Sequence, residues 1–216
     1  MLGIIICLVG VLALLVLDDF LAAAKIIKAE YRRKFAHITI GIFVASWPWL
    51  TSWRAIQAIA VLMILVVALN QWRPTFKFNS GLARTTYGDY FFAIGILLSA
   101  LLTTSKVFFM VAMLQMGLAD AVGAIVGKKF GIKWKYSVLN NTKTIIGSMA
   151  FWVTSLIILG AGTLFAHQFI SFSHYILILV FLPPILTLAE NLSVYGLDNL
   201  IIPVVVILAL RLAQGS

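Results

Sequence analysis

Two carboxylates, Asp120 and Glu190, are the residues of this chain best placed to do chemistry. Only seven of the 216 residues are acidic, and these two lie within or at the edge of long apolar segments. A carboxylate close to hydrocarbon is unfavourable unless it is paired, hydrated or bound to a metal, so it marks a candidate functional site. Asp120 lies about two turns inside the end of its apolar segment. We therefore take both residues as candidate catalytic or metal-binding groups.

Asp120 is followed by glycines at every fourth position and by a pair of lysines. These residues are Gly123, Gly127 and Gly131, with Lys128 and Lys129 between them. Glycine removes side-chain bulk, so a phosphate or another backbone can approach closely. The same spacing is typical of contacts between membrane helices, and the residues leave both interpretations open. A Walker A loop is excluded, because no Ser or Thr follows the lysine pair.

A second polar group gathers at the start of a later apolar segment. Its members are Asn141, Thr142, Lys143, Gly147 and Ser148. A helix N-terminus presents unpaired N–H groups and the positive end of a dipole, which suits an anion such as phosphate. Taken singly, Lys143 is more typical of a membrane-edge anchor and Thr142 of an N-cap. Together with Asp120, the group favours a site for the phosphates of a nucleotide.

Glu190 begins a third polar group, which continues to Asp198 and Asn199. Carboxylates and carboxamides are hard oxygen ligands, and Mg²⁺ is usually bound by one or two carboxylates together with the phosphates of a substrate. Asp120, Glu190 and Asp198 are therefore the candidate ligands for Mg²⁺ or another divalent cation. In the plainer alternative, Asp198 and Asn199 only cap the helix that follows them.

Further candidates for contact with a phosphate or a lipid headgroup lie where other apolar segments begin. Arg33, Lys34 and His37 precede or open one such segment, and the spacing i, i+4 puts Arg33 and His37 on one helical face. Asp89 opens another. The alternatives are a hydrogen-bonded structural role for His37 and a simple N-terminal helix position for Asp89.

The elements that must position these residues are membrane helices. A composition of 62% hydrophobic and 11% charged residues, with a mean hydropathy of +1.08, does not describe a soluble domain. We predict an all-α, polytopic transmembrane bundle that forms a single domain over residues 1–216. Apolar stretches of roughly 17 to 25 residues, long enough to span a bilayer, predict about eight helices, with seven as the alternative. They cover residues 1–17, 36–53, 54–70, 88–104, 106–127, 143–166, 174–190 and 199–213.

Basic residues are unevenly distributed between the predicted loops. Thirteen of the sixteen follow the first, third and fifth predicted helices. The thirteen are Lys25, Lys28, Arg32, Arg33, Lys34, Arg73, Lys77, Arg84, Lys128, Lys129, Lys133, Lys135 and Lys143. The positive-inside rule then places both termini outside and the polar groups on the cytoplasmic face. The net charge of +9 mostly expresses this topology, and nucleic acid is not an expected partner.

The polar groups, in this order, resemble the motifs of the membrane family of dolichol kinase, phytol kinase and the CTP-dependent diacylglycerol kinases. The similar segments are RKxxHI at 33–38, GDxxAxxxGxxxG at 119–131, K(S/T)xxGS at 143–148 and DNxxxP at 198–203, the last preceded by the acid Glu190. Ala119 stands where the second motif usually has glycine. The resemblance covers most of the chain, and its specificity lies in the ordered set of four motifs.

This resemblance implies an integral membrane enzyme that moves the γ-phosphate of CTP onto the hydroxyl of a lipid alcohol, with a divalent metal. Phosphoryl transfer requires positioning, metal and positive charge more than covalent chemistry. On this basis Asp120 and Asp198 are assigned to Mg²⁺, and the lysines at 128, 129 and 143 to the nucleotide phosphates. Glu190 is either a metal ligand or the base that accepts the proton of the lipid hydroxyl.

Two other functions compete with this interpretation. The first is a CTP-dependent lipid cytidylyltransferase, whose family is similar in its acids but has a longer chain and an extra acid and arginine where this chain has Asn199-Leu200. The second is a transporter, although transporter acids lie near the midplane and the acids here gather at one face. The residues leave open whether the acceptor is a polyprenol, phytol or diacylglycerol, and whether Gly123 and Gly127 serve a homodimer or an internal contact.

Overall fold

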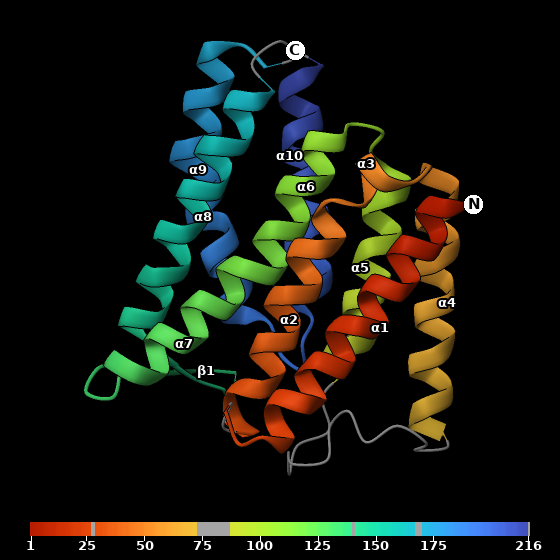
Figure 1. The fold of residues 1–216 in the computed structure, drawn as a ribbon. Helices are drawn as coiled ribbons and strands as arrows, with labels where there is room; N and C mark the ends of the chain where they lie inside the picture. The colour runs from red at the N-terminus through yellow and green to blue at the C-terminus, as the bar shows by residue number, and fades with distance from the viewer. Residues whose placement is uncertain (27–28, 73–86, 140, 167–169, 216) are drawn as a thin grey trace.

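Long helices packed side by side make up most of the chain in the computed structural model (Figure 1). The structure describes residues 1–26, 29–72, 87–139, 141–166 and 170–215, and in these ranges the side chains of residues 29–31, 33 and 71 are not described. The helices are α1 (Leu2–Ala23), α2 (Ala29–Ala45), α3 (Trp47–Leu50), α4 (Trp53–Trp72), α5 (Gly88–Leu102), α6 (Lys106–Leu114), α7 (Asp120–Phe130), α8 (Ile145–Phe165), α9 (Phe172–Leu192) and α10 (Asp198–Gln214). A π-helical turn, η1 (Gln115–Ala119), joins α6 to α7.

Among the described residues, five helices are long and apolar enough to cross a membrane. They are Leu2–Ala23, Trp53–Asn70, Lys106–Phe130, Ile145–Phe165 and Phe172–Leu192. The predicted mostly helical, apolar protein is thereby confirmed. The count of about eight crossings stays a prediction, because α2, α5 and α10 are shorter than these five helices. The N-terminus and the end of α10 lie toward the same end of the bundle (Figure 1), and the side of the membrane to which that end belongs also stays a prediction.

Local structure confirms one interruption of the predicted helices and differs from the prediction in two places. The segment over 36–53 is interrupted, as Trp47-Pro48-Trp49 indicates, and forms α2 and α3, because Pro48 lacks the N–H that a continuing helix needs and stands in the first turn of α3. The helix predicted from residue 143 begins at Ile145. The chain is also not purely α-helical, since β1 (Lys135–Val138) and β2 (Asn141–Thr144) form an antiparallel hairpin between α7 and α8. Tyr136, Val138 and the threonines of β2 favour extended backbone over helix.

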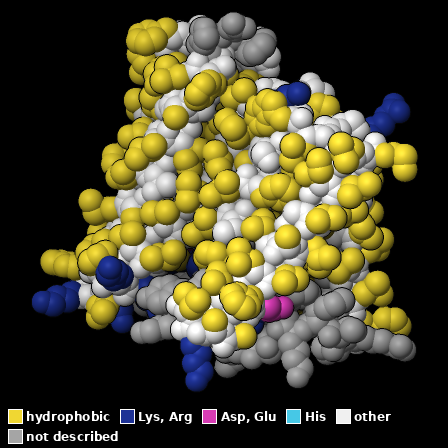
Figure 2. Space-filling view, in the orientation of Figure 1, with side chains coloured by type: hydrophobic (Ala, Val, Ile, Leu, Met, Phe, Trp, Pro, Cys, Tyr) yellow, Lys and Arg dark blue, Asp and Glu magenta, His cyan; other side chains and the backbone are white. Residues whose placement is uncertain are grey.

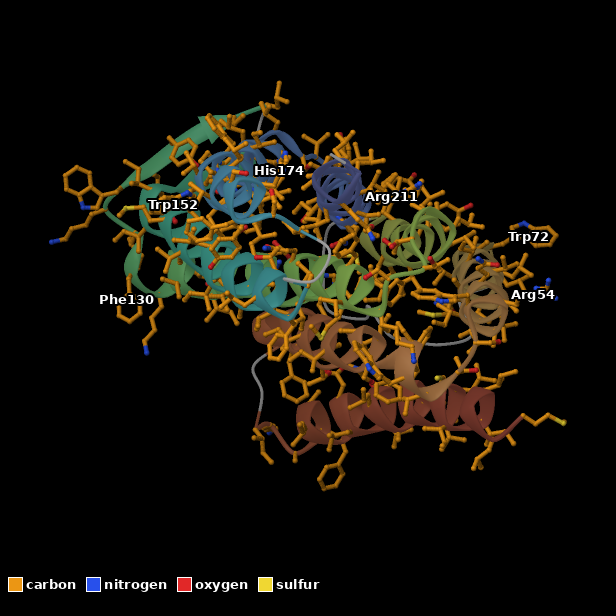
Figure 3. The ribbon with its side chains drawn as sticks, turned by 90° about the horizontal axis from the view of Figure 1, so that it is seen from above. Arg54, Trp72, Phe130, Trp152, His174 and Arg211 are labelled. Atoms are coloured by element: carbon orange, nitrogen blue, oxygen red, sulfur yellow. The ribbon has the colours of Figure 1, made fainter. Side chains whose placement is uncertain are left out.

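The continuous helix Lys106–Phe130 is the centre of the bundle. Of its most apolar window 61% is buried, against 11% for α1, which lies at the outer edge of the molecule (Figure 3). Helix α2 lies between the two. Its backbone approaches that of η1 so closely that only glycine fits: a Cβ added to Gly41 would stand 3.0 Å from the Cα of Gly117. This close approach brings the N-terminal half of α2 beside Asp120.

The outer surface of the helices suits a hydrocarbon solvent. Figure 2 shows hydrophobic side chains over the whole flank of the bundle in that view, with Lys and Arg mostly toward its two ends. Polar contacts also join α1 to α2: Arg32 of α2 donates to Asp18 at 2.8 Å and also pairs with Asp19. The hydrogen bond to Asp18 raises the pKa of Arg32. The predicted basic loop with Arg73, Lys77 and Arg84 lies outside the described residues.

Candidate active site

A polar cavity of about 840 Å³ lies between the hairpin and the neighbouring ends of α2, α5, α7, α8, α9 and α10. Most of the site residues predicted from the sequence line it. They are Lys34, His37, Asp89, Asp120, Gly123, Gly127, Lys128, Asn141, Thr142, Lys143, Gly147, Ser148, Glu190, Asp198 and Asn199. Helix packing has therefore brought four polar groups, far apart in the sequence, to one place.

Two predicted site residues are not among the side chains that line the cavity. Lys129 is exposed, and its ammonium lies 5.1 Å from the centre of the Phe130 ring. The side chain of Arg33 is not among those that the structure describes, so its predicted contact with a phosphate or headgroup stays a prediction. Asp89 does line the cavity, where α5 begins.

Asp120, the first residue of α7, is buried against α2. Lys34 donates a hydrogen bond to Asp120 Oδ2 at 2.5 Å. His37, one turn further along α2, has its Nε2 atom 3.9 Å from the same oxygen and 3.1 Å from the carbonyl oxygen of Met116. Two side chains that the sequence predicts as phosphate or headgroup contacts are thus also the neighbours of the buried acid, and a negative charge on Asp120 is balanced by Lys34.

The negative charge of Glu190, near the end of α9, is balanced by a lysine of the hairpin. Lys143 lies on β2, and its ammonium donates to Glu190 Oε1 at 2.5 Å and to the backbone oxygen of Glu190 at 3.2 Å. Both side chains are largely buried, at 23% and 13% exposure. The sequence placed Lys143 at a helix N-terminus; the structure places it on a strand, which carries its ammonium across to α9.

Asp198 differs from the other two acids. It is the first residue of α10, and no hydrogen bond or ion pair joins its carboxylate to another described residue. The helix-capping alternative is therefore wrong for Asp198, since no side-chain hydrogen bond caps this helix. Asn199 is buried and donates to the backbone oxygen of Gly88 at 3.0 Å, whereas its Oδ1 atom has no partner in the described part of the chain. Unsatisfied oxygen ligands therefore remain at this side of the cavity.

The glycines after Asp120 make an internal contact between α7 and α8. A Cβ added to Gly127 would lie 2.9 Å from the Cα of Gly147, and one added to Gly123 would lie 3.1 Å from the oxygen of Gly147. Both glycines also line the cavity, so a nucleotide contact remains compatible with this packing. Of the two alternatives for these glycines, the structure therefore shows the internal contact, and a homodimer stays a prediction.

The N-terminus of α8 opens toward the cavity, and its cap is not the predicted one. The hydroxyl of Thr144 accepts the N–H of Gly147 at 3.1 Å, whereas Thr142 is exposed on β2. Gly147 and Ser148 line the cavity from the first turn of α8. The positive end of the α8 dipole therefore lies at the same cavity as Lys34, which is an arrangement suited to phosphate.

Sequence reasoning missed several residues of the site. Lys135, Thr144, Ser193 and Tyr195 also line the cavity, and Asn141 reaches the backbone oxygen of Ser193 at 3.4 Å. The signal that could have found the strand residues is the run Lys-Tyr-Ser-Val followed by Asn-Thr-Lys-Thr, which alternates and is rich in strand-forming residues. Its short length and its position between two membrane helices made it easy to interpret as a loop.

The donor set fits a divalent cation only together with a substrate. No three acidic, His or Cys side chains among the described residues are close enough to hold a metal ion by themselves. However, Asp120, Glu190 and Asp198 share one cavity, and all are hard oxygen donors of the kind that Mg²⁺ binds alongside phosphates. The carboxylate of Asp198, which has no hydrogen-bond partner among the described residues, is the best available ligand.

The apolar helices and the polar cavity between their ends fit an integral membrane protein. A comparison with curated proteins agrees: the chain is 25% identical over 198 residues to a phytol kinase from Synechocystis sp., a match that covers 88% of this chain and 82% of that protein. No family model matches the sequence. No solved structure matches it either.

Proposed function

We propose that this protein phosphorylates a membrane lipid alcohol, with CTP as the phosphoryl donor and a divalent cation such as Mg²⁺. The observation that carries the proposal is the placement of Asp120, Glu190 and Asp198 around one cavity with Lys34 and Lys143. The similarity to a phytol kinase over most of the chain supports it. Polyprenols, phytol and diacylglycerol each present one hydroxyl at the interface and are the candidate acceptors.

In the proposed reaction the oxygen of the lipid hydroxyl forms a bond to the γ-phosphorus of CTP. The bond from that phosphorus to the bridging oxygen breaks, CDP leaves, and the hydroxyl proton passes to a carboxylate. Glu190 is the candidate base, because it lines the cavity near the end of a membrane helix, where the hydroxyl of a lipid can enter. The bound cation would neutralise charge on the transferred phosphate and its leaving group. Asp120 and Asp198 are the proposed ligands.

The two lysines of the ion pairs are the proposed phosphate-binding groups, together with Lys128 and the N-terminus of α8. In the structure, Lys34 and Lys143 neutralise Asp120 and Glu190. A triphosphate with its cation brings both signs of charge, so the lysines can turn to the phosphates while the carboxylates bind the cation.

Transfer of label into lipid tests the proposal. Purified protein would be incubated with Mg²⁺, γ-labelled CTP and, separately, phytol, a polyprenol and diacylglycerol, with the Asp120→Asn variant as a control. We expect label in the lipid phase with at least one acceptor and none with the variant. A parallel reaction with α-labelled CTP and phosphatidic acid separates a cytidylyltransferase, which would transfer the α-label. Absence of both transfers would overturn the kinase and favour a transporter.

The proposed site faces the cytoplasm, because the loops that carry its lysines hold most of the basic residues of the chain. A membrane-impermeant reagent that labels a cysteine introduced at Lys133, an exposed position of the α7–β1 loop, tests this orientation in a protein whose native Cys7 is replaced by Ser. We expect labelling only after the membrane is opened. Labelling of intact cells would place the site on the outer face.

A further inference from the structure

The hairpin contacts α9 through two neighbouring side chains, Tyr136 and Lys143, which bind the successive residues Asn191 and Glu190. Tyr136 on β1 is the cross-strand partner of Lys143 on β2. Lys143 binds Glu190, whereas the hydroxyl of Tyr136 lies 2.9 Å from Asn191 Oδ1 and donates to it. Cross-strand partners project from the same face of a sheet, so both contacts fix the same part of the hairpin against the end of α9.

A third hydroxyl completes this contact. Ser148 Oγ, in the first turn of α8, lies 2.6 Å from the Tyr136 hydroxyl and 3.0 Å from Asn191 Oδ1. Three oxygen atoms thus form a triangle, and the two hydroxyl protons supply two of its hydrogen bonds at a time. The triangle joins β1, α8 and α9, and of its three residues Ser148 lines the cavity, whereas Tyr136 and Asn191 do not.

The hairpin depends on such polar contacts for its position. No described residue of β1 or β2 is fully buried, and a two-stranded hairpin is marginally stable in isolation. The strands contribute Lys135, Asn141, Thr142, Lys143 and Thr144 to the cavity wall. A shift in the position of the hairpin therefore moves Lys143 relative to both Glu190 and the N-terminus of α8.

We infer that Tyr136 is a positioning residue: through Asn191 and Ser148 it sets the place of Lys143 and thereby the affinity of the cavity for the phosphates of the nucleotide. The inference rests on the proposed function for its substrate, and on the hydrogen-bonded triangle for its geometry. Tyr136 itself is not expected to touch the reacting atoms.

The test removes one oxygen atom. Tyr136→Phe keeps the ring and deletes the hydroxyl, and we expect the KM for CTP to rise about three- to tenfold, the effect of one lost hydrogen bond. The KM for the lipid alcohol and the yield of folded protein should stay unchanged, which a merely structural role would not predict. Asn191→Leu should reproduce the change, and the double variant should add little to either single variant, because both act on one contact.

The matched control is Tyr175→Phe. Tyr175 is half-buried near the other end of α9, where its ring stacks on Phe172 with centroids 6.3 Å apart. An unchanged KM for CTP in Tyr136→Phe, or an equal rise in Tyr175→Phe, would overturn the inference. If the wild-type protein transfers no phosphate, the proposed function fails, and equilibrium binding of labelled CTP replaces the kinetic readout: weaker binding by Tyr136→Phe alone still supports the positioning role, and equal binding refutes it.

Discussion

Lys34 and Asp120 form an ion pair at 2.5 Å although 86 residues separate them in the chain. The contact fixes α2 to the start of α7 at the rim of the cavity. Lys143 and Glu190 repeat the arrangement between the hairpin and α9. Each of these two acids is thus stabilised near the hydrocarbon by a lysine from a different element, as a carboxylate at membrane depth requires. The same pairing holds both lysines at the cavity that we propose binds the nucleotide.

Replacement of Asp120 by Asn should abolish activity while the protein still inserts into the membrane. The carboxylate is a proposed ligand of the cation, so we expect phosphate transfer to fall by about a hundredfold or more, the scale of losing a preorganised electrostatic contact. Initial rates of label transfer and the amount of protein in washed membranes measure the two effects. Asp19→Asn, at the outer edge of the bundle, is the control. A fully active Asp120→Asn enzyme would disprove the assignment.

Adjacent lysines should behave differently. Lys128 lines the cavity, whereas Lys129 is exposed beside Phe130 and does not. We expect Lys128→Ala to raise the KM for CTP about tenfold, as for a lost hydrogen bond to a charged group, and Lys129→Ala to change it by less than about twofold, since an exposed charge is screened by solvent. Equal effects of the two substitutions on the KM would contradict the position of the nucleotide phosphates.

Loss of Lys143 alone should destabilise the protein, and simultaneous loss of Glu190 should restore much of that stability. Lys143→Met leaves a largely buried carboxylate without its partner. We expect roughly 1–3 kcal/mol of destabilisation, less than for a fully enclosed pair because the cavity admits water. Thermal unfolding in detergent measures it. The double variant Lys143→Met with Glu190→Gln should be more stable than the single one yet inactive; an active double variant would remove both residues from the proposed mechanism.

A methyl group at Gly147 should disturb the packing of α7 on α8. A Cβ there would stand 2.9 Å from the oxygen of Gly123 and 3.1 Å from the Cα of Gly127, so the backbones must separate. We expect Gly147→Ala to lower the unfolding temperature in detergent, at a cost of about 1–3 kcal/mol, as for other overpacked contacts. Gly160→Ala is the matched control on the same helix, because its nearest neighbour would be 3.8 Å away. Unfolding temperatures that fall equally in both variants would contradict this account.

Much of the site was predictable from residue types alone. Acidic and basic residues beside long apolar segments are rare enough to be informative, and the positive charge of the loops indicates that they share one side of a membrane. Hence residue type and position along the chain are enough to select Asp120, Glu190, Asp198 and Lys143 as candidates. Length and hydropathy likewise predict most helices, because a membrane helix satisfies its own backbone hydrogen bonds within one continuous segment.

Residue order therefore dictates a set of apolar helices and the polar residues at their ends, whereas the pairing of those residues follows from the packing of the helices. Packing makes Lys34 bind Asp120, turns Lys128 but not Lys129 to the cavity, and lets a hairpin carry Lys143 to Glu190. The physical reason is that helix formation depends on neighbours a few residues away. Pairing across 86 residues depends instead on the close approach of whole helices, which is set by the glycine contacts between them.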